Sequence, residues 1–289
     1  MTAELLPPLF GLMAAMLFGI NVYIQGRGLA ATTGLHGAFL SVAATAGLFW
    51  LLAPFVIDWR WFATAGAAIF AATGLFFPAA GQGLQIAGVR RVGPALTAAL
   101  GAFTPVFSGV IAVAFLGEVL GLQSGLGFAL MVLGLMLAGL KTRNIPRGFP
   151  LWALAIPLGA SFVRGIAQVF TKLGMQSVHS PFFATLLAAT VSSGVLALLL
   201  RRNGQAVVRG LNRSHSWFIA SGAINGLGIL ALNSGIARGE LTIVAPMVAT
   251  TPLWTLVFGI TVFRTERLHL RQFLIAGMVV AGAVLLVTR

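Results

Sequence analysis

The chain has 289 residues, of which 58% are hydrophobic and 8% are charged. A soluble domain carries about 25% charged residues, so this composition excludes a soluble globular protein and indicates one that lies in lipid. The net charge of +13 would suit nucleic acid, but the basic residues lie in short gaps between apolar runs, as in membrane-protein loops, and we expect no nucleic-acid partner.

Apolar runs that are long enough to span a bilayer follow one another along almost the whole chain. A spanning helix needs about 20 mostly apolar residues. The segment that precedes the first run has no basic residue and no small-residue cleavage pattern, so we expect that run to stay as a membrane helix. The sequence predicts ten spans, near residues 6–25, 36–56, 61–87, 93–116, 121–140, 150–173, 181–200, 215–236, 241–263 and 268–288.

The two halves of the chain resemble each other. The segment TPVFS at 104–108, in the fourth run, matches TPLWT at 251–255 in the ninth, at a separation of 147 residues. Gly19 and Gly165, in the first and sixth runs, stand 146 residues apart. Such self-similarity at a nearly constant offset indicates an internal duplication.

We therefore divide the chain into a first five-helix repeat at 1–141 and a second at 149–289. Because each repeat has an odd number of spans, the two must insert with opposite orientation. The predicted fold is an all-α integral membrane domain of ten transmembrane helices, arranged as two inverted five-helix repeats.

The charges of the loops predict an orientation. The gaps on the side of the two termini hold Arg60, Lys172, Arg238 and Arg289, whereas the opposite side holds most of the remaining basic residues. By the positive-inside rule, the more basic side is cytoplasmic and both termini are outside.

A family resemblance rests on Pro105 and the apolar run after it, which ends in FLGEVL at 115–120, and on Pro252 with FRTERL at 263–268. This pattern resembles the signature of the drug/metabolite transporter superfamily, in its ten-helix EamA-type branch. The resemblance implies a multi-pass transporter of the cell inner membrane with a central cavity, lined by the first, third, fourth, sixth, eighth and ninth helices. It implies cytoplasmic termini, opposite to the charge count, and the branch includes amino-acid exporters.

Arg164 lies deep in the sixth run and shares one helix face with Ser161 and Gln168. All five acidic residues lie near the ends of runs, so Arg164 has no evident buried counter-ion, and an anionic group of a substrate is one candidate for it. The alternative is that Arg164 caps carbonyls of a broken helix or reaches water. The absence of a carboxylate in the spans argues against export of cationic drugs.

Other polar and aromatic residues of the spans are candidates for substrate binding. They are Asn21 of the first run, Gln82 of the third, Gln168 of the sixth, Asn225 of the eighth and Trp254 of the ninth. The alternative for the amides is hydrogen bonding between helices, worth about 0.6 kcal/mol each, and for Trp254 it is core packing.

Pro105 and Pro252 occupy matching mid-span positions. Paired breaks of this kind indicate a hinge or binding site, or else fixed kinks that serve packing. Glu118 and Glu266 lie at run ends, where we expect capping residues that pair with nearby arginines.

The sequence favours a secondary transporter of a small polar metabolite, best matched by an amino-acid exporter that works by alternating access. Alternatives are a carrier of another anionic or zwitterionic metabolite, a drug exporter, or, from another class, a membrane enzyme or lipid-handling protein. There is no cysteine, His cluster, phosphate loop or catalytic pair, so we expect neither an enzyme nor a cofactor. The expected partners are a small-molecule substrate and the lipid bilayer, with function as a monomer.

Overall fold

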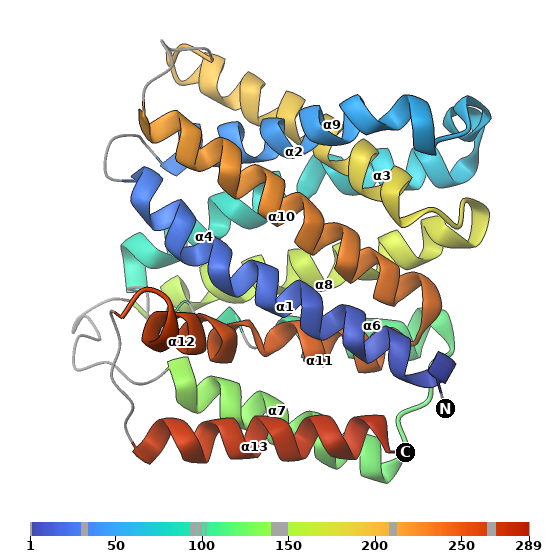
Figure 1. The fold of residues 1–289 in the computed structure, drawn as a ribbon, viewed down its shortest axis with the longest axis vertical. Helices are drawn as coiled ribbons and strands as arrows, with labels where there is room; N and C mark the ends of the chain where they lie inside the picture. The colour runs from blue at the N-terminus through green and yellow to red at the C-terminus, as the bar shows by residue number, and fades with distance from the viewer. Residues whose placement is uncertain are drawn as a thin grey trace.

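The computed structural model describes residues 2–29, 34–92, 97, 100–101, 103–139, 150–207, 213–264 and 270–288. Every regular element within these residues is helical (Figure 1). The elements are α1 (Thr2–Leu29), α2 (Gly34–Val56), η1 (Trp59–Ala63), α3 (Ala65–Phe76), α4 (Ala79–Val92), α6 (Thr104–Leu116), α7 (Leu122–Gly139), η2 (Leu151–Leu154), α8 (Ala155–Ser177), α9 (Pro181–Arg202), α10 (Arg213–Arg238), α11 (Leu241–Ala249), α12 (Thr251–Thr261) and α13 (Leu270–Val287).

The ten predicted spans are confirmed. Seven described segments are long and apolar enough to cross a membrane, and three shorter apolar helices fill the remaining predicted positions, at Thr104–Leu116, Leu122–Gly134 and Gly277–Leu286. Large apolar side chains such as Leu51 and Phe55 point outward, as lipid-facing residues do.

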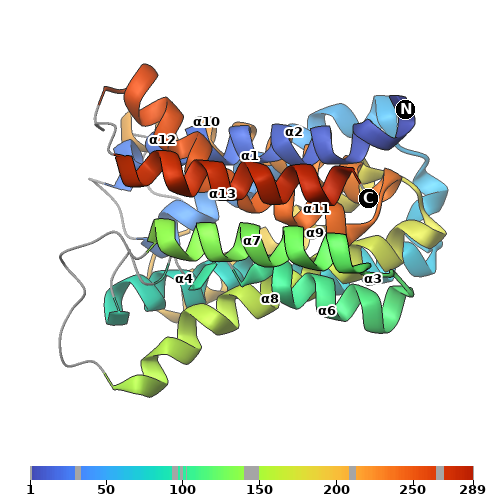
Figure 2. The same cartoon turned by 90° about the horizontal axis from the view of Figure 1, so that it is seen from below.

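Helices of the first repeat pack mainly against helices of the second, in equivalent pairs. The helix α1 packs along α10, and its counterpart α8 packs along α3 and α4. Likewise α6 packs against α8, while α11 and α12 pack against α1. The helices α7 and α13 lie side by side at one edge of the molecule (Figures 1 and 2). Both termini lie at the same end (Figure 1), which we call the terminus end.

Two hydrogen bonds show the inverted duplication at atomic detail. The Thr45 hydroxyl in α2 donates to the Gly222 carbonyl in α10 at 2.7 Å. The Ser192 hydroxyl in α9 donates to the Gly74 carbonyl in α3 at 2.8 Å. Ser192 stands 147 residues after Thr45 and Gly222 stands 148 after Gly74, so the bonds are repeat equivalents. The predicted two inverted five-helix repeats are confirmed.

The third, fourth and ninth spans each contain a break at a proline. The third span is interrupted between α3 and α4, at Pro78. In the other two spans the proline does not kink a continuous helix but stands in the first turn of a new one, Pro105 in α6 and Pro252 in α12. A missing amide is tolerated at that position.

The hydroxyl group of a neighbouring residue replaces each amide that proline lacks. Proline removes the donor to the carbonyl four residues earlier. The Thr104 hydroxyl donates to the Gly101 carbonyl at 2.9 Å, and the equivalent Thr251 hydroxyl donates to the Val248 carbonyl at 2.7 Å. At Pro78 the donor to Gly74 is Ser192 of another helix. The freed backbone groups are thus satisfied inside the membrane, as lipid requires.

Candidate substrate site

Arg164 lies at mid-depth on α8, beside the breaks in the third and fourth spans. A Cβ atom on Gly81 of α4 would lie 3.9 Å from Cγ of Arg164. The next residue, Gly165, packs so closely on α6 that a Cβ there would lie 2.9 Å from atoms of Phe107 and Ser108. Arg164 is therefore level with the start of both α4 and α6.

No carboxylate pairs with Arg164 within the described part of the chain. The buried ion pair found there joins Glu118 to Lys172, and Asp58 caps its own short helix at the surface. Arg164 is half-buried, so other protein groups cover part of its side chain.

Two of the predicted amide residues have a buried oxygen without a hydrogen-bond partner. They are Oδ1 of Asn21 in α1 and Oε1 of Gln168 in α8. A buried polar atom left unpaired costs about 1–3 kcal/mol, so these two oxygens keep Asn21 and Gln168 as candidates for binding a polar group.

Asn21 and Asn225 lie at the same depth on neighbouring helices. The antiparallel pair α1 and α10 is in register through Phe18, which lies against Gly228, and Pro7, which lies against Gly239. That register places Asn21 opposite Asn225. Asn225 is half-buried and stands about one turn from Gly228 on a similar side of α10.

Trp254 lies near the start of α12 and contacts α1. A Cβ atom on Gly19 would lie 2.9 Å from Cβ of Trp254. The Trp254 ring is half-buried, and its centroid is 6.4 Å from that of Phe258. The structure thus places Asn21, Asn225 and Trp254 around α1, and Arg164 with Gln168 along α8. Gln82 lies in α4, but its side chain is outside the described part of the structure.

Sequence reasoning missed a polar cluster at the terminus end. Lys172 Nζ lies 2.7 Å from Oε1 of Glu118 and donates to the Gly239 carbonyl at 2.8 Å. The amides of Leu241 and Thr242 donate to the two Glu118 oxygens at 2.7 and 2.9 Å. Glu118 therefore caps the start of α11, while its ionic partner is a lysine rather than the predicted arginine. Glu266 lies outside the described residues.

The contacts of Glu118 shift its ionisation. Burial on its own raises the pKa of this carboxyl. The hydrogen bonds from Lys172 and from the amides of Leu241 and Thr242, together with the lysine charge, outweigh burial, and the pKa lies below its ordinary value.

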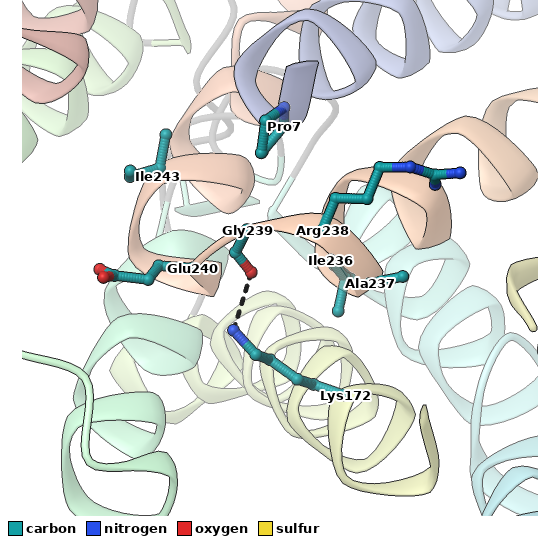
Figure 3. A pocket seen from close by; sticks show the side chains of 8 residues that line it. All are labelled: Pro7, Lys172, Ile236, Ala237, Arg238, Gly239, Glu240 and Ile243. Carbon is teal, nitrogen blue, oxygen red and sulfur yellow. Dashed lines mark hydrogen bonds between the residues drawn. The ribbon is translucent and has the colours of Figure 1, made fainter. Parts of the chain in front are cut away.

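Lys172 also lines an open pocket of about 570 Å³ at the terminus end. Figure 3 shows its side chain rising from α8 toward Gly239, while Arg238 and Glu240 extend to either side. One signal for this cluster was present in the sequence, because Arg164, Gln168 and Lys172 follow one another at helical spacing.

Ten apolar spans in two inverted repeats, with three broken spans and buried polar residues at mid-depth, define a multi-pass membrane transporter. A profile described as the EamA-like transporter family matches residues 5–140 and again 151–288. The chain belongs to this family, which is a family of transporters.

Two known proteins are similar to the chain. An uncharacterized transporter in the cobO 3' region of Sinorhizobium sp. is 32% identical over 137 residues, which are 47% of this chain and 93% of that protein. A solved structure, described only as the crystal structure of a protein, has a TM-score of 0.81 at 12% identity and covers 97% of this chain and 96% of its own. The second likeness is one of fold.

Proposed function

We propose that the protein is a secondary transporter of a small polar metabolite, with amino acids as the preferred substrate class. The proposal includes export across the cell inner membrane by alternating access, with the chain acting as a monomer. The observation that carries it is Arg164, a half-buried cation at mid-depth that has no carboxylate partner among the described residues.

An arginine in this position favours a substrate with an anionic group. Burying an unpaired charge is costly, and a carboxylate offers the guanidinium two parallel charge-assisted hydrogen bonds. A lipophilic cation would add a second positive charge at the same depth. The site therefore fits an anion or a zwitterion, and we place the substrate carboxylate on Arg164.

The remaining predicted residues suit the rest of such a substrate. The unpaired oxygens of Asn21 and Gln168 are acceptors for an ammonium group. The Trp254 ring offers an apolar surface for a side chain. Movement would occur at the breaks before α6 and α12, with Pro105 and Pro252 as hinges, because a broken span bends at less cost than a continuous one.

The first test is transport of radiolabelled amino acids into proteoliposomes by counterflow. Arg164→Ala is expected to lose at least about 10-fold in rate at low substrate, since truncating one partner of a buried charge pair costs 2 kcal/mol or more. Arg164→Lys keeps the charge but not the paired donors, and we expect an intermediate rate. The control is Arg201→Ala, which removes an exposed arginine at the end of α9.

Unchanged transport in Arg164→Ala would refute the role of this residue. The substrate class has its own test, in which each amino acid competes with its amide and with its decarboxylated amine. We expect competition from the carboxylates alone. Inhibition by organic acids without an amino group would instead favour a carrier of anionic metabolites, for which Arg164 is equally suited.

A further inference from the structure

A polar stripe on α8 leads from the candidate site to the terminus end. Arg164, Gln168 and Lys172 stand four residues apart, so they share one side of the helix. At a rise of 1.5 Å per residue, the stripe covers about 12 Å. Its middle member has an unpaired buried oxygen, and its last member lines the open pocket. Two cations thus lie about 12 Å apart on one side of a single helix.

The last cation of this stripe is occupied by a carboxylate of the protein itself. Glu118 binds Lys172 Nζ through Oε1 at 2.7 Å, as a substrate carboxylate would. The same carboxylate holds the first amides of α11, and Lys172 also holds Gly239. These bonds join α8, the segment after α6 and the start of α11 to one another beside the pocket.

We propose that Lys172 is a second, terminus-side subsite for the anionic group of the substrate, and that Glu118 is the internal carboxylate that fills it while this end is closed. This inference rests on the proposed function, since it takes a carboxylate as the transported group. A substrate carboxylate that reaches Lys172 displaces Glu118 into the open pocket, so the lysine keeps an anionic partner throughout. The displacement also releases the amides of Leu241 and Thr242, which couples substrate passage to movement of α11.

The test uses the reactivity of Lys172 in the purified full-length protein. The sequence contains two lysines, Lys141 and Lys172, so a membrane-impermeant amine-reactive ester and mass spectrometry of the resulting peptides report on each. Glu118→Gln removes the charge but keeps an acceptor oxygen for the α11 amides. We expect Lys172 to react at least about 10-fold faster in this variant, because the amine has lost its buried ionic partner. Lys141 serves as the reference in every sample.

The matched control is Arg238→Ala, in the same pocket. Arg238 donates to the Ser234 carbonyl at 3.0 Å and lies over the Phe10 ring, away from the ion pair, so its removal should leave the reactivity of Lys172 unchanged. Glu118→Asp keeps the charge on a shorter side chain, so Lys172 should react in this variant at a rate between those of wild type and Glu118→Gln. If Glu118→Gln unfolds, the rate in Glu118→Asp still tests the proposal.

The anion subsite is tested by adding acetate or chloride at equal ionic strength. Acetate should slow the reaction of Lys172 in Glu118→Gln more than chloride does, and neither should slow it in the wild type, where Glu118 occupies the lysine. Equal reactivity of Lys172 in wild type and Glu118→Gln would refute the claim that Glu118 occupies Lys172. Equal effects of acetate and chloride would refute the claim that Lys172 binds a carboxylate. Both readouts are independent of transport, so their failure is distinguishable from failure of the proposed function.

Discussion

Arg164 and Lys172 share one side of α8 but have opposite surroundings. Arg164 has no carboxylate within the described residues, whereas Lys172 is bound by Glu118 and by the Gly239 carbonyl. A protein keeps a buried cation without a counter-ion only at some cost in stability, and this cost is the reason for proposing an anionic substrate group as the partner of Arg164. Glu118 contributes to stability in two ways, because it caps α11 and also pairs with Lys172.

The lowered pKa of Glu118 predicts how its contribution to stability depends on pH. A carboxyl whose pKa is lower in the folded than in the unfolded state stabilises the fold above the unfolded value and loses that effect as pH falls through the folded value. The ordinary value is 4.5. The difference in thermal midpoint between wild type and Glu118→Gln should therefore be constant from about pH 8 to pH 5 and should shrink below pH 4.5.

Measuring both proteins across this range isolates Glu118, since every other carboxyl is common to the pair. A difference that declines already between pH 7 and pH 6 would contradict the lowered pKa. It would also indicate a carboxyl that takes up protons under physiological conditions.

At the scale of elements, the ten spans were predictable because each is an apolar run of sufficient length. The duplication was predictable because TPVFS and TPLWT keep their spacing from the glycines around them. The pairing of Glu118 with Lys172 was not, since the two are 54 residues apart and only the packing of α6 on α8 brings them together. The hydrogen bond from Ser192 to the Gly74 carbonyl was not predictable either, because it depends on the packing of α9 against α3.

The threonines that precede Pro105 and Pro252 should have equal and specific effects. Thr104→Val and Thr251→Val each leave a backbone carbonyl without its substitute donor, and we expect each to destabilise the protein by about 1–2 kcal/mol. The control is Thr261→Val. The Thr261 hydroxyl donates to the Val257 carbonyl at 2.8 Å, but that carbonyl also has its ordinary helical donor, so a change below about 0.5 kcal/mol is expected.

Unfolding by titration with a denaturing detergent measures all three variants. If Thr261→Val destabilises the protein as much as the other two, the hydroxyls do not act by replacing the missing proline amides. A larger effect in one half than in the other would show that the two breaks have different strain despite their equivalent bonds.

At the scale of the whole molecule, the repeats are not separate domains. The first helix of each repeat is buried against the other repeat, α1 along α10 and α8 along α3 and α4. The outer pair of helices, α7 and α13, likewise takes one helix from each repeat. A Cβ atom on Gly282 of α13 would lie 2.5 Å from the carbonyl oxygen of Gly127 in α7, and this close approach is typical of small residues at helix crossings in membranes. Each half alone would expose these faces.

This interdependence predicts the behaviour of the chain when it is cut between residues 141 and 149. Neither half expressed alone should accumulate, because its polar groups and small-residue faces would meet lipid instead of the other repeat. Thr45 would lose Gly222, and Ser192 would lose Gly74. Co-expressed halves should assemble one to one, since every one of those contacts is non-covalent. Purification through an affinity tag on one half, followed by transport measurements, tests this. Stable accumulation of the first half as a homodimer would contradict the expectation that each half needs the complementary faces of the other.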